Sequence, residues 1–135
     1  MNKVLIVEDE RDMRDGLACI LAAEGIEART AADGLAALGV LHDGWRPDVI
    51  VLDLMMPVMS GTEFRTAQLA DPGLAAIPVV VVSGRHDLAD AAPRLRPAAI
   101  LQKPFSMRAF LATVVPLVDV PAVPGGTALD VAARD

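Results

Sequence analysis

Short apolar runs recur along the chain and are separated by longer segments with a different hydrophobic period. Five runs of aliphatic and β-branched residues predict strands, at residues 3–7, 28–31, 48–52, 78–82 and 99–102. The first, third and fourth runs are almost uninterrupted by polar residues, which is typical of parallel strands covered on both faces. The sequence therefore predicts a buried parallel sheet.

The segments between and after the runs carry apolar residues every three or four positions, as amphipathic helices do. Helices are predicted at residues 12–24, 35–42, 62–70, 87–95 and 107–118. Gly25 follows the first helix where a C-terminal glycine is expected, and Ser106 is expected to cap the last helix. Within that last helix, one face is predicted to be apolar, formed by Met107, Phe110, Leu111, Val114, Val115 and Val118. Pro93 and Pro97 predict that the helix at 87–95 is short or irregular.

Five successive strand–helix units indicate the α/β class, with a doubly wound parallel sheet and helices on both faces. In such sheets, ligands bind beyond the carboxyl ends of the strands, where the winding direction reverses. The residues that directly follow the strands are therefore the candidates for chemistry.

Acidic, hydroxyl and amino groups follow four of the predicted strands. These positions hold Glu8 and Asp9, then Asp53, then Ser83 and Gly84, then Lys103 and Pro104. Carboxylate oxygens suit Mg²⁺, which binds through a few acids and retains several waters. A carboxylate beside such an ion can attack a phosphoryl group, and a lysine can bind one of the phosphoryl oxygens. The strand ends thus predict a magnesium-dependent phosphoryl-transfer site.

The same residues resemble those of bacterial response-regulator receiver domains. The resemblance rests on Val7-Glu8-Asp9, the stretch from Leu52 to Gly61 (LDLMMPVMSG), Val82-Ser83-Gly84 and Lys103-Pro104-Phe105, and it covers residues 3–118. It implies a flavodoxin-like (βα)5 fold with the strand order 2-1-3-4-5.

The resemblance also implies a role for each matching residue. Asp53 corresponds to the phosphoacceptor, assisted by Lys103 and Ser83. Glu8, Asp9, Asp53 and the Met55 carbonyl correspond to the ligands of Mg²⁺, which Mn²⁺ could replace. The backbone N–H groups of Met55 and Gly84 are expected to contact the phosphoryl group. Structural roles fall to Pro57, Gly61 and Pro104, and the Lys103–Pro104 peptide bond is expected to be cis.

Two features depart from the family's pattern. Ser83 is expected to act as the switch hydroxyl, but its usual aromatic switch partner is replaced by Ile100. The interval from Ser83 to Lys103 is also shorter than in most receivers. Together with the prolines, it predicts a reduced fourth helix, so the family's usual dimer face cannot be assumed, and a monomer or weak dimer is expected.

Length and composition limit the other possibilities. The 135 residues suit one domain at 1–118, followed by a Pro- and Gly-containing flexible tail at 119–135. A net charge of −6 with only 3% aromatic residues argues against direct nucleic-acid binding. No apolar run approaches the ~20 residues of a membrane span, and no secretory signal is present, so we expect a cytoplasmic protein. The single cysteine, Cys19, is expected to be a small buried apolar residue.

The leading hypothesis is a signalling domain, not an enzyme, that accepts a phosphoryl group from a histidine kinase or a histidine phosphotransfer protein. The 17 residues after Val118 are too few for an output domain. We expect the receiver either to act alone on an unidentified protein target or to have been excised from a longer chain. A pseudo-receiver that binds partners without phosphorylation is the alternative. An aspartate-based phosphatase is disfavoured because Met55, rather than a second aspartate, lies two residues after Asp53.

Overall fold

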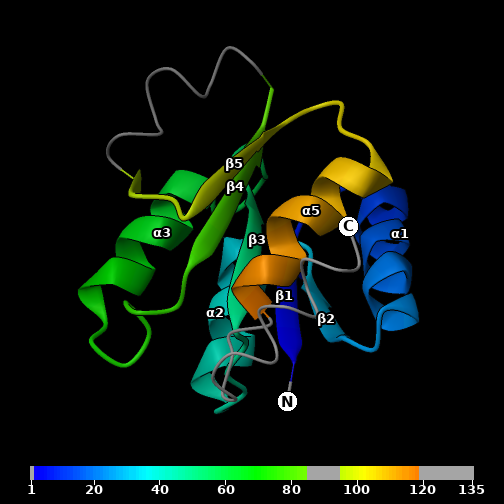
Figure 1. Ribbon diagram of the computed structural model, residues 1–135. Coiled ribbons are helices and arrows are strands. Elements are labelled where there is room, and N and C mark those ends of the chain that lie inside the picture. The colour runs from blue at the N-terminus through cyan, green and yellow to red at the C-terminus, as the bar shows by residue number, and fades with distance from the viewer. Residues whose placement is uncertain (1, 85–94, 119–135) are drawn as a thin grey trace.

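A computed structural model describes residues 2–84 and 95–118 and shows the expected parallel sheet between two layers of helices (Figure 1). The strands are β1 (Lys3–Val7), β2 (Glu27–Ala31), β3 (Val49–Asp53), β4 (Val79–Ser83) and β5 (Ala99–Gln102). The helices are α1 (Arg11–Ala23), α2 (Gly34–His42), α3 (Gly61–Ala70) and α5 (Met107–Val118). All paired strands are parallel, and their order is β2-β1-β3-β4-β5. The predicted fold class and strand order are confirmed.

The central strands are buried because each sends alternate side chains into two apolar layers. In β1, Leu5 packs into the layer formed with α2 and α3, whereas Ile6 packs into the layer formed with α1 and α5. Each layer contains one fully buried phenylalanine from a helix, Phe64 of α3 and Phe110 of α5. This two-sided burial explains why β1, β3 and β4 read as continuous apolar runs.

The predicted helix ends agree with the local hydrogen bonds. After α1, Gly25 has a φ of 78°, and its N–H donates to the Ala22 carbonyl while the Ile26 N–H donates to the Leu21 carbonyl. This pair of bonds is a Schellman motif, in which glycine readily adopts the left-handed conformation. Before α5, the Ser106 hydroxyl accepts a hydrogen bond from the Ala109 N–H at 3.0 Å, as a capping serine does.

Two predictions about individual side chains are wrong. Cys19 is exposed, because two positions along a helix turn the chain by about 200° and place it opposite the buried Leu17. Met107 is 60% exposed, although it lies in register with the buried Phe110 and Val114, because it is the first residue of α5 and precedes the stretch that packs on the sheet. The predicted fourth helix at 87–95 and the tail at 119–135 fall wholly or mainly outside the described residues.

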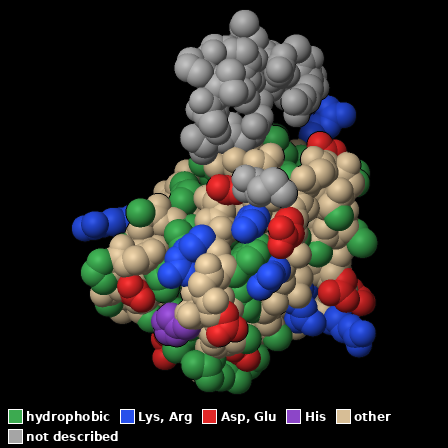
Figure 2. All heavy atoms as spheres, turned by 90° about the horizontal axis from the view of Figure 1, so that it is seen from below, with side chains coloured by type: hydrophobic (Ala, Val, Ile, Leu, Met, Phe, Trp, Pro, Cys, Tyr) green, Lys and Arg blue, Asp and Glu red, His purple; other side chains and the backbone are tan. Residues whose placement is uncertain are grey.

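Seen from the amino-terminal ends of the strands, the visible surface mixes charges (Figure 2). On this face, Lys and Arg side chains are interspersed with Asp and Glu side chains and do not merge into one continuous basic area. In the described part of the chain, no helix is long and apolar enough to cross a membrane.

Two buried polar residues of α3 were not anticipated from the sequence. Arg65 donates from Nε to the Leu95 carbonyl at 2.8 Å, from Nη2 to the Arg96 carbonyl at 3.1 Å, and from Nη1 to Gln68 at 2.8 Å. Gln68 in turn donates to the carbonyls of Leu74 and Ile77. Burial lowers the pKa of the Arg65 guanidinium, and the nearby Arg96 charge lowers it further. The pair ties α3 to the segment before β5 and to the connection before β4.

Replacing Arg65 by Met should lower the free energy of unfolding by about 2–4 kcal/mol, because buried carbonyls would lose donors that carry a charge. Urea denaturation of the variant measures this change. Thr66→Ala is the matched control, since Thr66 is exposed and its hydroxyl donates to the Thr62 carbonyl within α3. Equal stabilities for the Arg65→Met variant and the wild type would contradict the structural role of this tie.

Candidate functional site

The sheet order brings the predicted site residues to one edge of the fold. Glu8 and Asp9 follow β1, and Asp53 ends the adjacent strand β3. Ser83 ends β4, the other neighbour of β3, and Lys103 follows β5. Because all these strands are parallel, their carboxyl ends lie together, and the four positions converge on Asp53.

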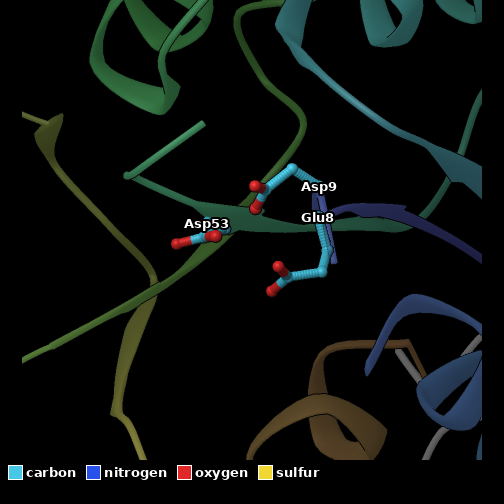
Figure 3. Close-up of side chains that lie close together, drawn as sticks. All are labelled: Glu8, Asp9 and Asp53. Carbon is cyan, nitrogen blue, oxygen red and sulfur yellow. The ribbon is translucent and has the colours of Figure 1, made fainter. Parts of the chain in front are cut away.

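Glu8, Asp9 and Asp53 form a compact acidic cluster (Figure 3). One carboxylate oxygen from each residue lies within 4.8 Å of those of the other two. Glu8 and Asp53 are both 3% exposed, whereas Asp9 is exposed to solvent. The cluster therefore has two buried acids and one acid at its mouth.

Lys103 supplies the positive charge that faces the two buried acids. Its Nζ lies 3.2 Å from Oε1 of Glu8 and 3.4 Å from Oδ2 of Asp53. The peptide bond between Lys103 and Pro104 is cis, as expected. The Lys103 N–H also donates to the Ser83 carbonyl at 2.9 Å, which fixes the lysine backbone to the end of β4.

Backbone N–H groups hold the remaining oxygens of the buried acids. The Met55 N–H donates to Oδ1 of Asp53 at 3.2 Å, and the Glu10 N–H donates to Oε2 of Glu8 at 3.1 Å. Each buried carboxylate is thus held at one oxygen by backbone and at the other by Lys103.

Burial dominates the electrostatics of this cluster. It raises the pKa of Glu8 to about 7, against the Glu10 N–H bond and the Lys103 charge, while repulsion from Asp53 adds to the increase. Burial also raises the pKa of Asp53, again against Lys103. For Lys103, burial acts to lower the pKa, but the charges of Asp53 and Glu8 outweigh it and the pKa is raised. The lysine stays protonated, and the carboxylates share one counter-charge.

The loop after Asp53 is held close to the strand end by Gly61. A Cβ atom at this position would lie 2.4 Å from the Asp53 carbonyl oxygen and 2.7 Å from the Leu54 Cα, so only glycine allows this approach. Ser60 caps α3 by accepting from the Glu63 N–H, and the Glu63 side chain accepts from the Ser60 N–H. The loop also contains the exposed Met55 and Val58, on either side of the half-buried Met56 and the exposed Pro57.

The structure separates one predicted residue from the rest. Ile100 lies on β5 opposite Val81, at the edge of the sheet, and is 42% exposed. Ser83 is fully buried at the end of β4, and Gly84 follows it. The expected switch pair therefore consists of a buried hydroxyl and an aliphatic side chain that is already partly exposed.

Arg14 is a site neighbour that the sequence interpretation missed. Its Nη1 donates to the Glu8 carbonyl at 3.1 Å and lies 3.4 Å from the Asp9 carbonyl. The sequence contained a usable signal for this contact. Arg14 lies about one turn after the start of α1, and a long side chain at that position can reach back to the loop that precedes the helix.

The donor set fits a small divalent cation. Three carboxylates converge without any histidine or cysteine in the cluster, and hard oxygen ligands of this kind suit Mg²⁺. The exposed Asp9 leaves one side of the cluster open to water, which Mg²⁺ retains in its coordination shell.

Comparison with known proteins agrees with this geometry. The chain is 39% identical over 116 residues to the sensory transduction protein RegX3 of Mycobacterium tuberculosis, covering 84% of this chain and 49% of that protein. It thus spans about half the length of the curated relatives it matches, which also include the DNA-binding response regulator MtrA of Mycobacterium leprae.

Two solved structures share the fold at appreciable sequence identity. The chemotaxis response regulator CheY4 of Vibrio cholerae is 31% identical, with a TM-score of 0.78 over 87% of this chain and 98% of that one. The response regulator TrrA of Thermotoga maritima, solved in complex with Mg²⁺ and BeF, is 26% identical, with a TM-score of 0.76 over 87% of this chain and 99% of that one. The response regulator receiver domain family matches residues 4–115. The chain therefore belongs to the response regulator receiver domains of two-component signalling systems.

Proposed function

We propose that Asp53 accepts a phosphoryl group from a phosphohistidine of a histidine kinase or histidine phosphotransfer protein, in a reaction that requires Mg²⁺. The observation that carries this proposal is the buried Asp53 carboxylate, which lies beside Lys103 and two further acids. The phosphorylated domain would then signal through contacts with a protein target.

The chemistry balances with the groups present. An Asp53 carboxylate oxygen forms a bond to phosphorus as the nitrogen–phosphorus bond of the donor breaks, and the bonding electrons leave with the imidazole. Lys103, at 3.4 Å from Oδ2, is placed to bind a phosphoryl oxygen as negative charge is redistributed. The Ser83 hydroxyl and the N–H groups of Met55 and Gly84 would bind the others.

Glu8, Asp9, Asp53 and the Met55 carbonyl would hold the metal, which would neutralise charge on the phosphoryl oxygens. Mn²⁺ should substitute for Mg²⁺, since it also accepts oxygen ligands. Cytoplasmic location, the absence of direct DNA binding, a monomeric or weakly dimeric state and a flexible 119–135 tail remain predictions.

Incubation with a small phosphodonor and Mg²⁺ should add the mass of one phosphoryl group to the wild-type protein. Asp53→Asn should abolish the addition, because an amide is not a nucleophile here. Asp15→Asn is the control, as Asp15 lies on the outer face of α1 and pairs with Arg11. Intact-mass spectrometry with and without a chelator makes the measurement. An unmodified wild-type protein would favour the phosphorylation-independent pseudo-receiver.

Mg²⁺ should raise the melting temperature, because a ligand that binds only the folded state stabilises it, by about 2.7 kcal/mol at 100 times its dissociation constant. Asp9→Ala should abolish the shift, whereas Glu10→Gln, at the adjacent exposed acid, should retain most of it. Thermal denaturation across a Mg²⁺ titration measures both. If Mg²⁺ raised the melting temperature of Asp9→Ala as much as that of the wild type, the metal would bind at another site.

The same binding should depend on pH. Below about pH 7, Glu8 holds a proton in the folded protein, so Mg²⁺ competes with it and loses up to about tenfold in affinity per pH unit. Without metal, the Glu8 contribution to the free energy of unfolding should fall as the pH rises from about 4.5 to about 7. Over this range Glu8 loses its proton in the unfolded chain but keeps it in the folded protein, so rising pH favours the unfolded state. Calorimetric titrations at several pH values test the first effect, and denaturation series test the second.

We also predict that the activated state changes mainly the loops beside Asp53. Ile100 is smaller than the usual aromatic switch partner and has no hydroxyl, so it gains little from a large inward or outward movement. Beryllofluoride, which mimics the phosphoryl group, should shift amide resonances near Asp53, Ser83 and Lys103, with small shifts across 88–100. Ile100→Tyr should widen the response if the missing ring limits it. Large cooperative shifts across 88–100 in the wild type would contradict the prediction.

A further inference from the structure

We propose that Arg14 is a positioning residue that sets the metal affinity of the acidic cluster by holding the backbone of the loop between β1 and α1. The inference rests on the proposed Mg²⁺ site and goes beyond it, since Arg14 itself contacts no carboxylate of the cluster. Its guanidinium instead binds the main-chain carbonyls of the two residues whose side chains would bind the metal, Glu8 and Asp9.

Asp9 depends on this contact more than the other acids do. The Glu8 carboxylate is held by Lys103 and by the Glu10 N–H, and the Asp53 carboxylate by Lys103 and the Met55 N–H. Within residues 2–84 and 95–118, no hydrogen bond or ion pair holds the exposed Asp9 carboxylate. The backbone of Asp9 therefore sets the region that its carboxylate can reach.

Arg14 is well placed to fix that backbone. It is half-buried in the second turn of α1, and its own N–H donates to the Glu10 carbonyl at 2.9 Å, so its backbone is anchored in the helix. From there, one guanidinium nitrogen reaches the Glu8 carbonyl at 3.1 Å and approaches the Asp9 carbonyl to 3.4 Å. Both contacts come from Nη1, whose place is fixed by the planar guanidinium, whereas the ammonium of a lysine ends a flexible stem of different length and would hold the two carbonyls less firmly.

The direction in which Mg²⁺ affinity changes when Arg14 is removed distinguishes a positioning role from a purely electrostatic one. A positive charge near a cation site repels the metal, so electrostatics alone predicts that removing Arg14 tightens Mg²⁺ binding. Positioning predicts the opposite, because lost outer contacts typically weaken metal binding by about 10–100-fold. A role limited to stabilising α1 would lower the melting temperature and leave the metal affinity of the folded protein unchanged.

The test compares Arg14→Met and Arg14→Lys with Arg11→Met. Arg11 is the matched control, because it lies on the same helix, carries the same charge and has an 82% exposed side chain that forms an ion pair with Asp15. Mg²⁺ affinity is measured by calorimetry well below each melting temperature, and amide shifts of residues 8–10 are followed during the titration.

Arg14→Met should weaken Mg²⁺ binding by about tenfold or more, and Arg14→Lys should weaken it less. Arg11→Met should leave the affinity unchanged or slightly higher. Unchanged or tighter binding in Arg14→Met would overturn the inference while leaving the proposed metal site intact. Absence of Mg²⁺ binding in the wild type would overturn both. If Arg14→Met does not fold, Arg14→Lys decides alone, because it keeps the charge and alters only the geometry.

Discussion

The balance between buried carboxylates and one lysine governs the chemistry of this domain. Glu8 and Asp53 are almost fully buried, and burial disfavours their charged forms enough to raise the pKa of both. Lys103, within 3.4 Å of each, offsets only part of that cost. A site with more acids than basic groups, closed on one side by the sheet, would suit a divalent cation, as the proposed function requires.

The fold makes this arrangement possible by covering the strands on both faces. The apolar side chains of β1, β3 and β4 stabilise the sheet without help from the groups at its carboxyl edge. The backbone then fixes those groups through short contacts, such as the Gly61 approach to Asp53 and the Lys103 N–H bond to Ser83. Stability therefore lies in the two apolar layers, and the edge can hold residues that repel one another.

Much of this could be predicted from the sequence because the informative residues follow directly on recognisable strands. The fully apolar runs revealed β1, β3 and β4, and the parallel arrangement brought Glu8, Asp53 and Lys103 to one edge. The burial of side chains whose environment depends on distant segments was harder to predict. Arg65 and Gln68 have polar side chains, yet both are buried, because their partners are carbonyls of residues 74–77 and 95–96. Cys19 has apolar neighbours in the sequence, but the turn of α1 places it on the outer face.

The Arg65 contacts also bear on how far a change at Asp53 can spread. Two hydrogen bonds from the buried guanidinium hold the carbonyls of Leu95 and Arg96, just before β5. Breaking hydrogen bonds to a buried charge costs about 1.5–3 kcal/mol each, whereas coupling between sites in proteins is typically about 1–3 kcal/mol in total. A shift of the segment before β5 that separated it from α3 would therefore cost more than such coupling supplies. In the loop after Asp53, the side chains of Met55 and Val58 are exposed, so they can move without breaking a buried contact of their own. A phosphoryl group on Asp53 would thus act first on the surface that directly surrounds it.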